Sequence, residues 1–136
     1  MTAGDLGADG VKCVVLLAPA AVLRDDAIRG STMGARYNPL DPPELIPLFS
    51  DLKLGGEYIR TAFSLHIYET ARKYTGPACI IHGTGDPVVP YTYGERYHYI
   101  WPDSELHILH AADHGFSRNM QEVVDLTVNY LIKNLK

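Results

Sequence analysis

Three short, strongly apolar segments stand out along the chain, and each ends in turn-forming residues. They are Val11 to Leu17, Ala78 to His82 and Glu105 to Leu109. The first two are almost continuously apolar and rich in β-branched residues, which is typical of parallel strands covered on both faces. We therefore predict an α/β fold whose core is three parallel strands with flanking helices.

The segments between and after these strands carry helical patterns. Tyr91 to Trp101 has aromatic and apolar residues at i, i+4 and i+7, and Phe116 to Leu135 has the pattern of a closing amphipathic helix. Tyr58 to Tyr74 also predicts a helix, with basic residues in its last turn and a Gly-Pro stop after it. Met1 to Leu6 is too short to stand alone as a helix, and Gly7 to Gly10 predicts a turn.

The least regular part of the chain is Ala21 to Thr75, which lies between the first two predicted strands. It contains three breaker signals, Asn38-Pro39, Asp41-Pro42-Pro43 and Gly55-Gly56. Long connections of this kind are often functional. We therefore interpret residues 1–136 as part of one domain, with a cap or lid insertion at about 21–75.

Length, composition and charge exclude several classes of protein. The 136 residues are enough for one domain, and 46% hydrophobic residues support a packed core. A net charge of −4 without a basic run argues against nucleic acid as a partner. No apolar run approaches the roughly 18 residues of a membrane span. The first ten residues lack the pattern of a signal peptide, so we expect no membrane association and a cytoplasmic location.

The cysteines and histidines do not predict a metal site. Cys13 and Cys79 lie in apolar segments, where a free thiol behaves as a small core residue. His107, His110 and His114 form an H-x2-H-x3-H pattern, but odd spacing on a strand sends side chains to opposite faces. No H-E-x-x-H helix or C-x-x-C pair supports zinc. We expect neither a metal nor a cofactor.

The strongest candidate site lies where the second and third predicted strands end. The stretch Cys79 to Pro90, CIIHGTGDPVVP, changes from apolar residues to a polar loop that carries Asp86. His114 follows the third strand in the same way, within Ala112 to Phe116. The carboxyl ends of parallel strands meet at one edge of a sheet, where sites of α/β proteins gather. We predict an Asp86–His114 hydrogen bond of ~2.6–3.2 Å, with the carboxylate orienting the imidazole.

These two motifs resemble a known family. HGTGDPVVP followed by ADHGF is similar to the acid and histidine segments of an α/β-hydrolase, whose triad runs Ser, Asp or Glu, His along the chain. Asp86 and His114 match the last two members. No G-x-S-x-G motif occurs in this sequence, so the resemblance implies a partial α/β-hydrolase fold that lacks the nucleophile. VVLLAPA looks like the strand after the nucleophile, so we expect the chain to start just beyond it.

A narrower resemblance covers the insertion. The runs LLAPAAVLRDDAIRGSTMGARYNP and DLKLGGEYIRTAFSLHIYE are similar to the cap of bacterial cinnamoyl (feruloyl) esterases. By motif position, the resemblance implies that Asp26 and Tyr58 bind the phenolic hydroxyl of the substrate. Met33 stands where that family commonly has glutamine. Alternatively, Asp26 is a solvated charge beside Asp25 and Arg24, and Tyr58 is a packing residue at a helix start.

The resemblance implies a serine carboxylic-ester hydrolase that acts on a small aromatic or acyl ester. Because this chain has neither serine elbow nor oxyanion donors, we expect it to be inactive in isolation. Three interpretations remain open. The chain is a fragment of such an esterase, a non-catalytic half-domain that binds aromatic ligands or a complementary chain, or part of a hydrolase for a different ester, lactone or amide.

The first predicted strand also bears on association. In the family fold, the strand at Val11 to Leu17 pairs with the strand that precedes the nucleophile. Lys12 is its only charge, so an open edge here has little to discourage pairing. We therefore expect self-association, or association with a complementary N-terminal chain.

Overall fold

The computed structural model describes residues 1–136, which form two compact units. The first unit combines Met1–Ala20 with Ile67–Lys136, and the second is Ala21–His66. The second unit is thus an insertion between two segments of the first. Residues 67–75, which we had assigned to the insertion, group with the first unit.

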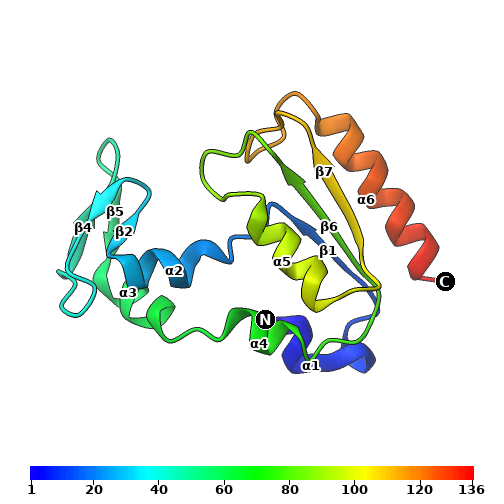
Figure 1. The fold of residues 1–136 in the computed structure, drawn as a ribbon, viewed down its shortest axis with the longest axis horizontal. Helices are drawn as coiled ribbons and strands as arrows, with labels where there is room; N and C mark the ends of the chain where they lie inside the picture. The colour runs from blue at the N-terminus through cyan, green and yellow to red at the C-terminus, as the bar shows by residue number, and fades with distance from the viewer. The chain divides into compact units, whose positions relative to one another are not determined.

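A parallel sheet forms the centre of the first unit (Figure 1). Its strands are β1 (Val14–Leu17), β6 (Ala78–Gly83) and β7 (Glu105–Leu109), in the spatial order β1-β6-β7. Every residue of β6 is buried, as expected for a central strand of nearly continuous apolar sequence. The predicted α/β class and its three parallel strands are confirmed. The first strand, however, begins at Val14 and not at Val11.

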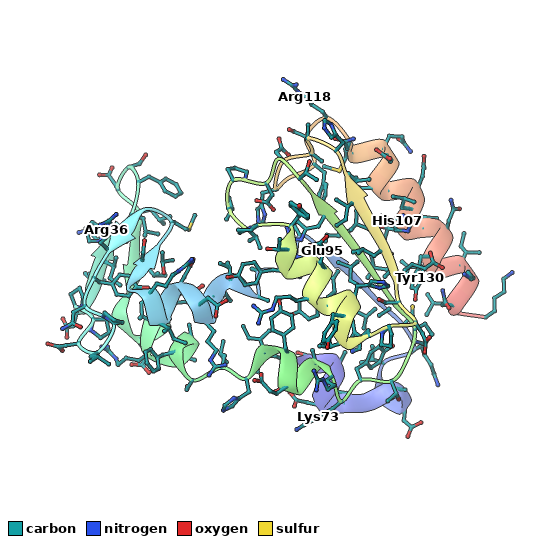
Figure 2. The ribbon with its side chains drawn as sticks, viewed as in Figure 1. Arg36, Lys73, Glu95, His107, Arg118 and Tyr130 are labelled. Atoms are coloured by element: carbon teal, nitrogen blue, oxygen red, sulfur yellow. The ribbon has the colours of Figure 1, made fainter.

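Helices cover both faces of this sheet. Cys79 and Ile81 of β6 pack in one cluster with Val123 and Tyr130 of α6 (Met120–Asn134), and Figure 2 shows Tyr130 between α6 and the sheet. His82, on the opposite face by alternation, meets α5 (Thr92–Ile100). Both helices lie within the ranges predicted for them, and each is shorter at its ends.

The turn predicted at Gly7 to Gly10 was wrong, because these residues belong to a helical segment that packs against a distant part of the chain. Residues Thr2–Gly10 form α1, two short helices joined at Gly7, whose φ is 68°. A Cβ on Gly4 would lie 1.9 Å from the carbonyl oxygen of Thr70, so glycine here allows close approach to α4 (Ile67–Ala71). A helix this short is stabilised by packing rather than by its own sequence.

The second unit has a small core of its own. Ala27 of α2 (Val22–Arg29) and Ile59 and Ala62 of α3 (Gly56–Phe63) enclose Ile46. Its elements are α2 (Val22–Arg29), β2 (Ser31–Thr32), β3 (Ala35–Arg36), β4 (Leu45–Pro47), β5 (Lys53–Gly55) and α3 (Gly56–Phe63), with β2–β3 and β4–β5 paired antiparallel.

The single helix predicted from Tyr58 to Tyr74 is two helices. α3 ends at Phe63 and α4 begins at Ile67, so the break falls at the boundary between the two units. Ile59 and Ile67 share a helical spacing but are buried in different units. No helix of the structure is both long and apolar enough to cross a membrane.

Candidate active site

Two loops that follow neighbouring strands are held together at the carboxyl end of the sheet. After β6, the Thr84 N–H donates to the Leu109 carbonyl at 2.9 Å, and the Gly85 N–H donates to the Ala112 carbonyl at 3.1 Å. In return, the Ala111 N–H donates to Thr84 Oγ1 at 2.8 Å. These bonds fix the loop that carries Asp86 against the loop that carries His114.

The glycines of H-G-T-G-D make this close approach possible. A Cβ on Gly83 would lie 2.0 Å from the Ala112 oxygen, and one on Gly85 would lie 2.8 Å from the Ala111 oxygen. Both distances are below normal contact, so larger residues would force the loops apart. The motif therefore has a steric function in addition to supplying its acid.

The Asp86 carboxylate is fully buried and hydrogen-bonded through both oxygens. Oδ1 accepts from the N–H groups of Val88 and Val89, at 2.8 and 2.9 Å. Oδ2 lies 2.8 Å from Nδ1 of His114. Burial by itself would raise the pKa of Asp86, but the Val89, His114 and Val88 hydrogen bonds and the His114 charge lower it below its ordinary value. Asp86 is thus kept as an anion.

The predicted hydrogen bond between Asp86 and His114 is confirmed, and its geometry determines the tautomer of His114. An ionised carboxylate can only accept, so Nδ1 of His114 carries the proton. In the uncharged ring, Nε2 is then the basic nitrogen. The His114 side chain is 42% exposed, whereas the Asp86 side chain is 0% exposed. The pair therefore combines the buried carboxylate of Asp86 with the solvent-accessible imidazole of His114.

A second carboxylate shapes the loop around His114. Asp113 accepts hydrogen bonds from the Ser117 hydroxyl and from the Ser117 N–H, the latter at 2.9 Å. The hydrogen bond from the Ser117 hydroxyl contributes most to lowering the pKa of Asp113, and the bond from the Ser117 N–H lowers it further. Phe116 is buried with a positive φ of 54°, and its N–H donates to the Asp113 carbonyl at 3.1 Å. This tight turn sets where the backbone presents His114.

Similarity to solved structures agrees with this arrangement. Est1E from Butyrivibrio proteoclasticus with ferulic acid bound superposes with a TM-score of 0.91 at 24% identity, over 98% of this chain and 53% of that one. Over the compared residues, the chain has the fold of an α/β-hydrolase. A second Est1E structure gives a TM-score of 0.89 at 24% identity, over 98% of this chain and 55% of that one.

A more distant hydrolase structure matches as well. It is E-2-(acetamidomethylene)succinate hydrolase, with a TM-score of 0.52 at 17% identity over 96% of this chain and 61% of that one. No protein-family model and no curated protein sequence matches the chain. The chain spans about half the length of the Est1E structures.

The other two predicted site residues belong to the second unit of this hydrolase-fold chain. Tyr58 of α3 lines a cavity of ≈ 350 Å³ with Leu23, Glu57, Thr61, Ala62 and Leu65. Asp26 of α2 forms an ion pair with Arg29, and its side chain is 15% exposed, so it is not simply a solvated charge. Burial is the main cause that raises the pKa of Tyr58, and the charges of Asp26 and Tyr37 raise it further. The phenol therefore stays protonated at neutral pH and can donate.

One site residue was missed by the sequence interpretation. His82 is 0% exposed, and its Nε2 lies 3.0 Å from the Val89 carbonyl oxygen and 3.2 Å from Asp86 Oδ2. Its position before Gly83, with an acid four residues on, was the available signal, but it was interpreted only as a strand end. Of the histidines in the H-x2-H-x3-H pattern, His107 lies 3.7 Å from Glu105 and His114 contacts Asp86. No group of three or more potential metal ligands is assembled.

The buried Asp86 anion predicts a pH-dependent stability. At pH 7, Asp86→Asn is expected to lower the free energy of unfolding by about 1–3 kcal/mol, since it removes charge-assisted hydrogen bonds. Because the folded pKa of Asp86 is depressed, its contribution is complete above the unfolded value of about 3.9 and is lost as pH falls through the folded value. Urea unfolding of wild type and variant should therefore show that the difference between their free energies of unfolding becomes smaller as the pH is lowered from 7 to 3.

Asp103→Asn is a suitable control, because Asp103 is an exposed acid in the turn before β7. It should leave stability unchanged to within about 0.5 kcal/mol. A wild-type to Asp86→Asn difference that stays constant down to pH 3 would contradict the assignment of Asp86 as a stabilised anion.

Proposed function

We propose that the chain supplies the acid and the base of a Ser-Asp-His carboxylic-ester hydrolase. The observation that supports this most is the 2.8 Å bond from His114 Nδ1 to the buried Asp86, on a ring that is itself 42% exposed. In this role, His114 Nε2 takes the proton of a serine hydroxyl as it attacks the ester carbonyl. It then returns that proton to the leaving alcohol, while Asp86 stabilises the imidazolium.

The serine and the oxyanion donors must then come from a segment outside this sequence. Support comes from β1, which pairs with β6 on one side only. The N–H groups of Val14 and Ala18 donate to the strand and loop beside them, so by alternation those of Val15 and Leu17 face the open edge. We propose that a complementary strand occupies this edge and brings the nucleophile with it.

For the substrate, we propose a hydroxycinnamoyl ester. The cavity beside Tyr58 is lined mainly by apolar groups, which suits a flat aromatic ring, and the Tyr58 hydroxyl and Asp26 suit a phenolic hydroxyl. Est1E, which has the same fold over 98% of this chain, holds ferulic acid in one structure.

Binding measurements on the full chain test this substrate class. Tyr58→Phe keeps the ring and removes the hydroxyl, so we expect ferulic acid to bind about 5–10-fold more weakly, the cost of one hydrogen bond. Cinnamic acid, which has no phenolic hydroxyl, should bind equally to both proteins. Fluorescence titration gives both dissociation constants. An equal loss for both acids would leave Tyr58 as a packing residue only.

A further inference from the structure

His82 lies behind the Asp86–His114 pair, at the end of β6, and its contacts are unusual for a core residue. The ring is completely buried, and Nε2 faces two acceptors, the Val89 carbonyl at 3.0 Å and Asp86 Oδ2 at 3.2 Å. Two acceptors require a donor between them, so Nε2 carries a proton. Nδ1 is buried without a hydrogen-bond partner, which is consistent with the single proton being on Nε2.

The same segment of backbone connects His82 to the acid. The Val89 carbonyl accepts from His82, and the Val89 N–H donates to Asp86 Oδ1 at 2.9 Å. His82 therefore fixes the turn that fixes one carboxylate oxygen, and its Nε2 also lies beside the other oxygen, which accepts from His114. Val89 itself is 1% exposed, so water is not available to replace this bond.

Helix α5 makes room for the imidazole. A Cβ on Gly94 would lie 2.8 Å from Nδ1 of His82, so the ring occupies space that only glycine leaves open. From this helix, His82 meets a residue without a side chain. Nε2 is therefore the ring nitrogen that makes the polar contacts, and these contacts are with Val89 and Asp86.

We propose that His82 is a positioning residue for the acid of the site: its Nε2–H holds the Asp86–Val89 turn so that Oδ2 of Asp86 faces His114. This inference rests on the Asp86–His114 pair of the proposed function, but not on ester hydrolysis itself. His82 acts on His114 through Val89 and Asp86. The effect of removing it must therefore be visible in the His114 ring.

A matched pair of variants separates the donor from the bulk of the ring. In His82→Gln, the terminal amide nitrogen reaches the position of Nε2 and can still donate to Val89. In His82→Asn, the amide ends near the position of Nδ1 and cannot. Both replace the ring by a smaller polar side chain, so loss of packing is similar in the two.

The experiment is nuclear magnetic resonance of the full chain labelled with ¹⁵N-histidine, with His114→Ala to assign the ring signals. We expect wild-type His82 to be protonated on Nε2 and His114 on Nδ1, with a low-field Nδ1–H signal from the bond to Asp86. That signal should persist in His82→Gln and be lost in His82→Asn. Ester hydrolysis is not needed for this readout, so it can succeed where the proposed reaction fails.

Two results would overturn the proposal. One is a His114 Nδ1–H signal that both variants keep or both lose, which would make His82 a space-filling residue. The other is a wild-type His82 ring protonated on Nδ1, because Nε2 could not then donate to Val89. This second measurement needs no variant, so it decides the question even if His82→Asn does not fold.

Discussion

The purified chain alone is expected to hydrolyse ethyl ferulate and p-nitrophenyl acetate no faster than its His114→Ala variant. The reason is chemical: His114 can accept a proton, but this sequence contains no G-x-S-x-G serine for it to activate. Oxyanion stabilisation is usually the largest single contribution to catalysis, and in this fold its donors come from the residue after that serine and from a loop after an earlier strand. Paired initial-rate measurements on the two proteins check this expectation.

The opposite result is expected once a segment carrying the nucleophilic serine is joined to the chain. In that protein, His114→Ala should reduce kcat by about 10⁴-fold or more, because the members of a triad act as a unit. His110→Ala is the matched control: His110 is an exposed histidine at the end of β7, and its loss should change kcat less than about twofold. The DNA upstream of Met1 shows whether such a segment is encoded in frame.

These measurements also distinguish the proposed hydrolase from its alternatives. A His114-dependent rate in the isolated chain, with a fluorophosphonate attached to Ser64, Ser104 or Ser117, would contradict the need for an external serine. A joined protein that acts on lactones or amides but not on ferulate would keep the triad and replace the substrate class. A joined protein that hydrolyses neither ferulate esters nor lactones nor amides would support the interpretation of the chain as a non-catalytic binding half-domain.

The second large effect concerns the open edge of β1. At micromolar concentration, we expect the isolated chain to sediment as species larger than the 15.0 kDa monomer. The N–H groups of Val15 and Leu17 face this edge, Leu17 is 48% exposed, and no residue of Val14–Leu17 is charged. Natural edges are usually charged, covered or bulged, because exposed apolar edges pair with one another.

The other edge of the same sheet shows what a protected edge looks like. On β7, Glu105 forms an ion pair with Lys133 of α6, with 2.7 Å between Oε1 and Nζ, and His107 lies beside Glu105. Figure 2 shows His107 on this strand. Charged residues of this kind oppose strand pairing, so we expect association through β1 and not through β7.

A pair of substitutions tests which edge is used. Leu17→Lys places a charge on β1 and should shift sedimentation toward the monomer. Leu6→Lys, at a leucine 58% exposed in α1, makes the same chemical change away from the sheet edge and should not. A wild-type chain that is a compact monomer with a cooperative melt above ~45 °C would show that the edge is tolerated.

The sequence alone was sufficient for the strands and for the acid and histidine. Val14–Leu17 and Ala78–Gly83 are visible as nearly continuous apolar runs, as expected for parallel strands covered on both faces, and Glu105–Leu109 as a shorter segment in which apolar residues alternate with Glu105 and His107. Asp86 and His114 were paired because parallel strands place their carboxyl ends at one edge of the sheet, whatever the length of chain between them. Both inferences need only local composition and chain order.

Helix boundaries depended on contacts that composition does not encode. The apolar spacing of Ile59 and Ile67 is the same in one long helix as in two, and the break between α3 and α4 follows from burial in different units. Likewise, α1 is two short helices joined at Gly7, and its Gly4 packs closely against Thr70, far along the chain. Periodicity reports which residues are buried, but not against which partner.

The inner part of the site was decided by tertiary structure. His82 is an ordinary strand-end histidine in the sequence, and only the fold brings Val89 and Asp86 to its Nε2. The roles of Gly83 and Gly94 are likewise invisible until Ala112 and His82 are placed beside them. Hydrogen bonds and close contacts act over about 3–4 Å between atoms that folding brings together, so their geometry exists only in the folded chain.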